Sequence, residues 1–174
     1  MKKYFALLVL LSMLLIITSC SPKQDDYYAD LNSFSITTLT NETDINGDLI
    51  VRPNLDGGKF TISWSTDFNT PSGNAIFTPY IWSGTLDRNN DYITHRNCGG
   101  ITASCQSSGS LNCVLGTDNV INCGDTRSLN ISGLLGNAIA AKLNVTGEVC
   151  VYDDTLTEIC DTRVIPVHFE TVPL

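Results

Sequence analysis

The sequence predicts an all-β sandwich, and three observations support this prediction. Short runs of β-branched and aromatic residues alternate with polar residues, and turn-forming clusters separate them about every ten residues. Long apolar stripes at helical spacing do not occur after the first twenty residues. The chain has 174 residues, which is the length of one ordinary domain, so a large multidomain enzyme is excluded.

The first nineteen residues have the organisation of an export signal. Two lysines follow Met1, and the apolar run over residues 5–17 is shorter than the roughly 20 residues that span a bilayer as a helix. Residues 17–20 read Ile-Thr-Ser-Cys, and this motif resembles the lipobox of bacterial lipoproteins. The resemblance implies cleavage before Cys20, diacylglyceryl transfer to its sulfur and acylation of the new amino terminus. Two or three acyl chains hold a protein on a membrane stably.

We therefore divide the chain into a lipoprotein signal peptide (1–19), a lipidated tether (20–28) and a β-sandwich domain (29–174). In Gram-negative lipoproteins a serine after the cysteine, here Ser21, goes with sorting to the outer membrane. The expected location is the cell envelope, with the lipid on Cys20 in the outer membrane and the face undetermined. The alternative is an ordinary secretory signal with a cysteine near the cleavage site.

The clearest predicted strand is 59–65, where Phe60, Ile62 and Trp64 share one face and polar residues occupy the other. Pro79 removes a backbone donor, so its strand should lie at a sheet edge or carry a bulge. The segment 134–141 is alanine-rich but short and contains Gly136, which favours a turn leading into a strand. The other predicted strands are 32–39, 49–52, 75–82, 91–94, 111–115, 119–122, 128–132, 142–152 and 159–169.

Four places in this strand order resemble immunoglobulin-like and fibronectin type III-like sandwiches, including cell-adhesion-related domains of bacterial surface proteins. They are the start at 29–31, Trp64 on an early central strand, the run from Trp82 to Asp91, and 131–136 before a long strand. The last place is similar to the Leu-x-x-Gly corner of fibronectin type III domains, although Ile139 stands where a tyrosine is usual. The resemblance implies a single immunoglobulin-like β-sandwich but no particular function.

Six cysteines follow Cys20, an even number in an exported chain, where disulfides form and persist. The segment from Cys113 to Cys123 is echoed by the segment from Cys150 to Cys160, because both pairs enclose nine residues and both are followed by Asp-Thr-Arg, after a glycine in the first case. Each enclosed segment carries a turn cluster at its middle, so each pair can face across a hairpin. The predicted disulfides are Cys113–Cys123, Cys150–Cys160 and, by exclusion, Cys98–Cys105; the main alternative joins Cys98 to Cys123 and Cys105 to Cys113.

Charge and motif content exclude several function classes. Without the signal peptide, eight basic and eighteen acidic residues remain, a formal charge of −10, which argues against a nucleic-acid partner. No nucleophile elbow, phosphate loop, dinucleotide fingerprint or zinc motif is present, so we expect no enzyme, cofactor or metal site. The two histidines, His95 and His168, are not near a cysteine pair at zinc spacing, and nothing in the sequence places a carboxylate beside His95. A carboxylate pair of the glycosidase type stays open, because sequence spacing does not reveal distance in space.

Two acidic clusters invite a calcium interpretation. Residues 44–48 place three oxygen ligands at alternate positions, but Leu49 replaces the glycine of an EF-hand loop and Leu55 replaces its bidentate glutamate. We predict a solvated turn there, and another at the cluster 87–91. Three glycosylation sequons begin at Asn41, Asn130 and Asn144, and we interpret them as strand and turn residues.

The sequence thus predicts a lipid-anchored envelope or surface protein whose sandwich is a binding, adhesion or structural module for an unknown protein or glycan. The candidate contact loops are the turn 153–158, the loop 67–74 and the cystine loop near Cys98. The alternatives are a periplasmic inhibitor or envelope assembly factor and an envelope hydrolase.

Overall fold

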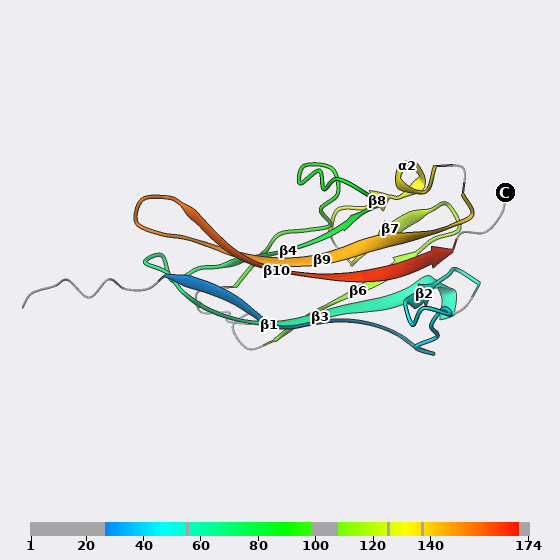
Figure 1. The fold of residues 1–174 in the computed structure, drawn as a ribbon, viewed down its shortest axis with the longest axis horizontal. Coiled ribbons are helices and arrows are strands. Elements are labelled where there is room, and N and C mark those ends of the chain that lie inside the picture. Colours follow the sequence, from blue (N-terminus) through cyan, green and yellow to red (C-terminus); the bar gives the residue numbers. More distant parts are fainter. Residues whose placement is uncertain (1–26, 55, 99–107, 125, 137, 171–174) are drawn as a thin grey trace, which may run out of the picture.

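The computed structural model describes residues 27–170, except for 55, 99–107, 125 and 137. Two five-stranded sheets pack face to face (Figure 1). Within the described residues, no helix has the length and apolar character that a membrane span requires. The first sheet contains, in spatial order, β1 (Tyr28–Thr38), β3 (Lys59–Asn69), β6 (Gly109–Leu115), β7 (Val120–Asn122) and β8 (Leu129–Asn130). The second contains β2 (Leu49–Val51), β10 (Glu158–Glu170), β9 (Ala140–Tyr152), β4 (Ile76–Trp82) and β5 (Arg96–Asn97).

The all-β sandwich predicted from the sequence is confirmed, and its core follows from strand periodicity. Phe60, Ile62 and Trp64 of β3 are all buried, as their alternation predicts. The Trp64 ring stacks on Phe77 of the opposite sheet, with 4.2 Å between ring centroids. Phe60 meets Phe169 edge to face at 5.9 Å. These aromatic contacts join the two sheets at the centre of the core.

Every predicted strand is present with shifted bounds except 91–94, which is wrong. That segment forms only an isolated bridge between Tyr80 and Tyr92, because it belongs to a loop that folds back over β4. The short strand β5 was not predicted. Two short helical turns also occur, η1 (Asp56–Gly58) and α2 (Ser132–Leu135). Gly136 ends α2 with a φ of 62°, and β9 begins four residues later, so the predicted turn into a strand contains one helical turn.

Pro79 lies beside the isolated bridge between Tyr80 and Tyr92. The Pro79 carbonyl accepts from Ile93 N at 2.8 Å, on the side of β4 that faces away from β9. Backbone N–H and C=O of one strand residue point to the same side, so the absent N–H also faces this loop. β5 pairs with β4 only at Ile76 and Phe77. β4 is the fourth of five strands and pairs with β9 across Pro79 without a register shift, so the predicted edge or bulge at Pro79 is wrong; its missing N–H faces the isolated bridge of the loop that folds back over β4 instead.

The central strands follow the immunoglobulin-like arrangement, in which the A and B strands share one sheet and the C, F and G strands share the other. β1 and β3 correspond to the first pair, and β4, β9 and β10 to the three strands of the second sheet. The edge beyond β3 departs from that arrangement. β6 lies next to β3, and β7 and β8 follow outward in chain order. In immunoglobulin domains the strand next to B is E, and strand D, which precedes E in the chain, lies outside E.

Two predicted disulfides are confirmed. Cys113 is bonded to Cys123, and Cys150 is bonded to Cys160, with ten residues of sequence separation in each case. This pairing contradicts the crossed alternative, which needed Cys123 and Cys113 for other partners. Cys98 is buried, and its predicted partner Cys105 lies outside the described residues, as does Cys20.

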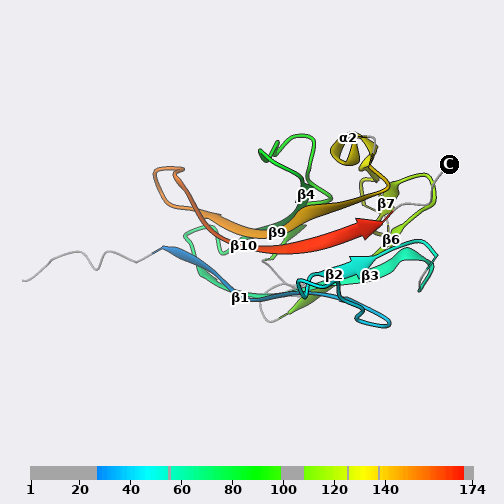
Figure 2. The same cartoon turned by 45° about the vertical axis from the view of Figure 1, so that its right-hand side comes forward.

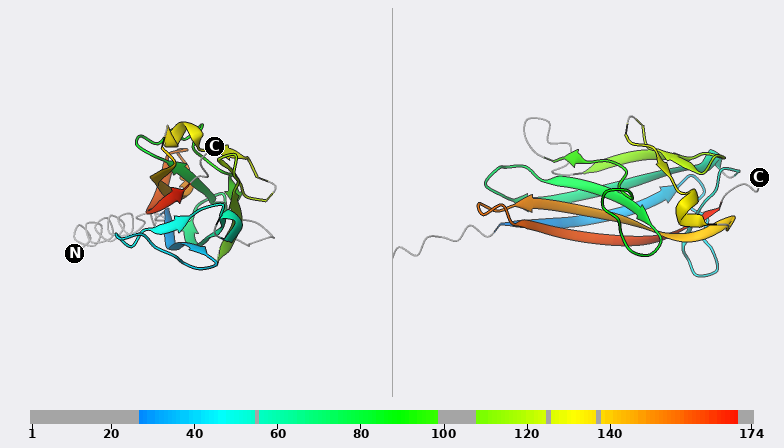
Figure 3. Two further views of the ribbon diagram at one scale, coloured as in Figure 1. Left: turned by 90° about the vertical axis from the view of Figure 1, so that its right-hand side faces the viewer. Right: turned by 90° about the horizontal axis from the view of Figure 1, so that it is seen from above.

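The two ends of the elongated sandwich carry different segments (Figures 1, 2 and 3). At one end, which we call the N-terminal end, β1 begins at Tyr28 opposite Asn69. The Thr70 hydroxyl donates to the Tyr152 carbonyl at 2.7 Å, which brings the β3–β4 and β9–β10 turns to this same end. The opposite end, which we call the distal end, carries the loop 39–48, the β6–β7 turn and α2.

Candidate functional site

A buried carboxylate lies on the outer face of the second sheet. Glu148 occupies the middle of β9 between β4 and β10, and it is only 4% exposed. Even-numbered residues of β9 point away from the core, so this side chain would be open to solvent in a bare sheet. The loop 83–95, which connects β4 to β5, covers it instead. Burial of a charge is costly unless the charge is paired, so the partners of Glu148 matter.

Three side chains surround this carboxylate. Tyr80 donates its phenol to Oε1 at 3.1 Å, and Arg88 donates Nη2 to Oε2 at 2.7 Å. The Thr162 hydroxyl lies 3.5 Å from the same Oε2. Arg88 is half exposed and also lies 3.6 Å from a carboxylate oxygen of Glu158, so it joins the buried acid to the surface. Glu148 is thus a paired charge that ties the covering loop to the sheet.

The covering loop owes its shape to the acidic cluster at 87–91. Asp91 is buried and accepts from the backbone N of Asp87 at 2.7 Å. Asp87 in turn accepts from Asn90 and from the backbone N of Asn89. These hydrogen bonds, that of Asn90 first, lower the pKa of Asp87 below its ordinary value. The predicted turn is confirmed, and its ordering places Arg88 over Glu148.

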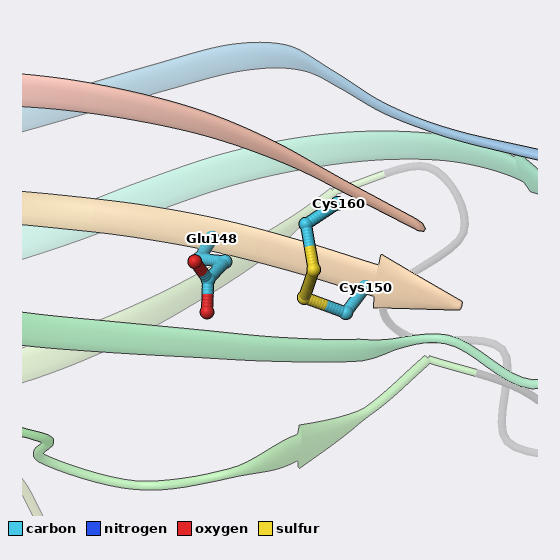
Figure 4. Close-up of side chains that lie close together, drawn as sticks. All are labelled: Glu148, Cys150 and Cys160. Atoms are coloured by element: carbon cyan, nitrogen blue, oxygen red, sulfur yellow. A yellow bond between two sulfur atoms is a disulfide. The ribbon is translucent and has the colours of Figure 1, made fainter. Parts of the chain in front are cut away.

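The Cys150–Cys160 disulfide lies directly beside Glu148 (Figure 4). Glu148 and Cys150 are two residues apart on one strand, so they share a face, and Cys160 is the residue opposite Cys150 on β10. One carboxylate oxygen and the two sulfurs lie within 4.8 Å of one another. Among the described residues, this is the only group of three His, Cys, Asp or Glu side chains that comes so close.

His95 borders the same small cleft, whose volume is about 100 Å³. Its Nδ1 lies 3.0 Å from the Thr78 hydroxyl, and its ring stacks on Tyr92 with 4.7 Å between centroids. Tyr92 also contacts Arg127, whose guanidinium carbon lies 4.5 Å from the centre of the Tyr92 ring. His95 and Glu148 therefore share a cleft, although no feature of the sequence places a carboxylate near this histidine.

His168 points outward on β10, as predicted, and lies 3.6 Å from Asp44 Oδ2. Asp44 Oδ1 accepts from the backbone N of Asn46 and of Asp48, the pattern of an Asx turn. The Lys142 ammonium lies 2.5 Å from Asp48 Oδ2, where a calcium ion would need that oxygen. The predicted solvated turn is therefore the better interpretation of the 44–48 cluster.

A second, larger cleft of about 820 Å³ lies beside the start of β6. Gly109 leaves room there for Trp64, because a Cβ at this position would lie 2.5 Å from the indole ring. Trp64 Nε1 is buried without an acceptor among the described residues. The lining of this cleft is mostly polar and includes Ser33, Ser63, Ser108, Ser110, His95, Arg96 and Asn97. The cystine loop near Cys98, one of the candidate contact loops, lies outside the described residues from 99 to 107.

The comparisons found no matching family model, no curated relative and no similar solved structure. Function is therefore inferred from the residues of this chain. Sequence reasoning missed Glu148, because its burial depends on a loop some 60 residues away. One signal was present: the Glu-Val-Cys order at 148–150 places the acid and the cysteine on one face of a strand.

The carboxylate network should appear in the titration of Tyr80. Burial and the adjacent Glu148 charge raise the pKa of Tyr80 to about 12. The folded state favours the neutral phenol, so the stability from this group is complete below pH 10 and is lost as pH rises from 10 through about 12. Ultraviolet titration of tyrosinate should show one late component that Tyr80→Phe removes. Persistence of that component in the variant would contradict this assignment.

Loss of the buried charge should destabilise the fold more than loss of a surface charge. We expect Glu148→Gln to lower the free energy of unfolding by about 2 kcal/mol, because buried hydrogen bonds to a charged group are lost. Glu158→Gln is the matched control. It removes an exposed partner of the same arginine and should cost below about 1 kcal/mol. Urea denaturation monitored by circular dichroism gives both values, and equal losses would refute the difference.

Proposed function

We propose that this protein is a lipid-anchored component of the bacterial cell envelope whose β-sandwich is a binding, adhesion or structural module. The observation that carries the proposal is the lipobox-like sequence ending at Cys20, followed after seven residues by the first strand of a disulfide-bonded domain. Disulfides persist outside the reducing cytosol, which supports an exported location. The outer membrane is the proposed address, from Ser21 after the cysteine.

Lipidation at Cys20 would orient the domain on the membrane. The chain from Cys20 to Tyr28 spans about 27 Å when fully extended and about 16 Å as a flexible coil. The N-terminal end of the sandwich would therefore stay close to the bilayer. Two of the contact loops that the sequence suggested, 67–74 and 153–158, lie at this end.

The N-terminal end is poorly suited to lie flat on an anionic membrane. Its turns carry Asp67, Asp153, Asp154 and Glu158, and no basic residue lies within these two loops. Like charges across the interface would hold this end away from anionic headgroups, within the tether's reach.

The distal end is therefore the better surface for a partner, and we revise the contact site accordingly. It carries three of the four most exposed large apolar side chains of the described residues: Leu39 is 84% exposed, Ile45 is fully exposed and Ile139 is 59% exposed, while the N-terminal end carries the fourth, Leu156. Exposed apolar residues near charged side chains are typical of protein contact surfaces. We propose a protein partner at this end, with an adhesive or structural role in the envelope.

The lipid anchor is tested by Cys20→Ala. Cells grown with a radiolabelled or alkyne-tagged palmitate should label the wild-type protein, and the label should vanish in the variant. The variant should move from the detergent-rich phase to the aqueous phase of a phase-separating detergent. Ser21→Ala is the matched control and should keep the lipid. An uncleaved N-terminus on the wild-type protein, by intact-mass measurement, would refute the proposal.

Protease treatment of intact cells separates the remaining roles. Digestion of the wild-type domain would place it on the surface, as an adhesin requires, and whole cells should then bind host matrix or glycans. Protection until the outer membrane is opened would place it in the periplasm, as an inhibitor or assembly factor requires. Turnover of an envelope polymer that is lost on substitution of one acidic pair would instead indicate a hydrolase.

A further inference from the structure

The two described disulfides differ in their exposure and in their neighbours. Cys113 and Cys123 are 1% and 0% exposed, and they lie in the core. Cys150 is 7% exposed, but its partner Cys160 is exposed at the surface of β10. A thiolate attacks a disulfide along the line of its sulfur atoms, so access to a sulfur governs the rate of exchange. Cys150–Cys160 is therefore the disulfide that a reductant outside the protein can reach.

Reduction of this bond would leave three metal-ligating groups together. An external thiol reductant attacks the Cys160 sulfur, and the Cys150 sulfur leaves as a thiolate. A second equivalent of the thiol then resolves the mixed disulfide, so that one protein disulfide and two reductant thiols become two protein thiols and one reductant disulfide. In the disulfide form the two sulfurs and one oxygen of Glu148 lie within 4.8 Å of one another, so reduction would leave two thiols and a carboxylate as neighbours on one face of the sheet.

We propose that Cys150, Cys160 and Glu148 form a redox-gated site for a soft divalent cation, closed as a disulfide and open to metal when reduced. Zinc and cadmium prefer thiolate ligands, and three protein ligands with one open position form a known type of tetrahedral site. Zinc bonds to sulfur and oxygen are about 2.3 and 2.1 Å long, so after reduction the two sulfurs must move apart to ligate one ion, which rotation of the cysteine side chains allows.

The surroundings of Glu148 suit this role. Tyr80 donates to Oε1 at 3.1 Å and Arg88 to Oε2 at 2.7 Å, so the carboxylate is held in place before a metal arrives. Hydrogen bonds of this kind orient metal-ligating carboxylates in proteins. β9 and β10 stay joined over thirteen residue pairs, from Glu158–Tyr152 to Glu170–Ala140, so opening one disulfide leaves the two cysteines opposite each other.

The test uses the full mature protein in a mild non-ionic detergent. Reduced glutathione is added without denaturant, the reductant is removed under anaerobic conditions, and peptide mapping identifies the opened disulfide. Cadmium chloride is then titrated while the ultraviolet thiolate-to-metal absorption is recorded. We expect glutathione to open Cys150–Cys160 before Cys113–Cys123. The reduced protein should bind one cadmium ion per chain, and the oxidised protein should show no such band.

Two variants separate this site from binding by any pair of thiols. Glu148→Gln should weaken cadmium binding at least tenfold, since it removes one of three ligands. Asp154→Asn, which alters an exposed acid of the β9–β10 turn outside the cleft, should leave the affinity unchanged. Replacement of both Cys150 and Cys160 by serine should abolish the band. Equal affinity in Glu148→Gln, binding by the oxidised protein, prior opening of Cys113–Cys123, or loss of the β-sheet circular dichroism on reduction would each overturn the proposal.

Discussion

Replacement of Cys150 and Cys160 by alanine is expected to lower the free energy of unfolding by about 3 kcal/mol, and the same change at Cys113 and Cys123 by about 4 kcal/mol. Each disulfide closes a loop of ten residues, and the loss of that constraint on the unfolded chain is worth about 3 kcal/mol. The additional loss at Cys113 and Cys123 arises because both of these sulfurs are buried in the core, where their removal leaves a void.

Urea denaturation under oxidising conditions measures these losses. The two disulfides lie in different sheets, so the losses should add in a variant with all four alanines. Wild-type protein denatured with a strong dithiol reductant is the matched control, and it should approach the stability of the four-alanine variant. A larger loss for Cys150 and Cys160 than for Cys113 and Cys123 would contradict the role assigned to burial.

The disulfide pairing could be predicted because it is local. The two ten-residue echoes place each pair across a hairpin, and neither pairing needs knowledge of the rest of the fold. Alternation over β3 likewise placed Phe60, Ile62 and Trp64 in the core, because a strand with one buried face has a fixed register. The 44–48 turn was predicted from its own residues for the same reason.

The buried Glu148 network could not be predicted, because it depends on contacts between distant segments. Arg88 and Glu148 are separated by 60 residues, and they meet only because the loop 83–95 folds back over the second sheet. The segment 91–94 has strand composition but no free strand edge beyond its bridge to Tyr80, so propensity gave the wrong answer there. The spatial order of β6, β7 and β8 could not be predicted either, because the alternation of polar and apolar residues identifies a strand but not its neighbours in the sheet.

The bulge in β1 shows how one distant contact can change a strand. The register of β1 against β3 shifts between Leu31 and Ser33, and the Leu31 backbone N donates to Asp161 Oδ2 on β10 at 2.8 Å. A side chain from the opposite sheet thus satisfies a donor of an edge strand. Such caps reduce the tendency of edge strands to pair with other chains. This contact also explains an aspartate that points inward from β10.

Truncation of Phe77 is expected to have an effect as large as loss of a disulfide. Phe77 is fully buried, and its ring lies 4.2 Å from Trp64 and 6.3 Å from Phe34. Phe77→Ala removes the ring that joins the two sheets, and we expect a loss of about 4 kcal/mol, from lost burial and the cavity left behind. Gly147 packs against the same ring, since a Cβ there would lie 3.1 Å from Phe77.

Ile45→Ala is the matched control for Phe77→Ala. Ile45 is fully exposed in the 44–48 turn, so its truncation removes no buried surface and should change stability by less than about 0.5 kcal/mol. Both values come from urea denaturation followed by tryptophan fluorescence, because Trp64 stacks on Phe77 and reports the core directly. The same Ile45→Ala protein should bind a distal-end partner more weakly. A stable Phe77→Ala protein with unchanged Trp64 emission would show that this aromatic contact does not join the sheets.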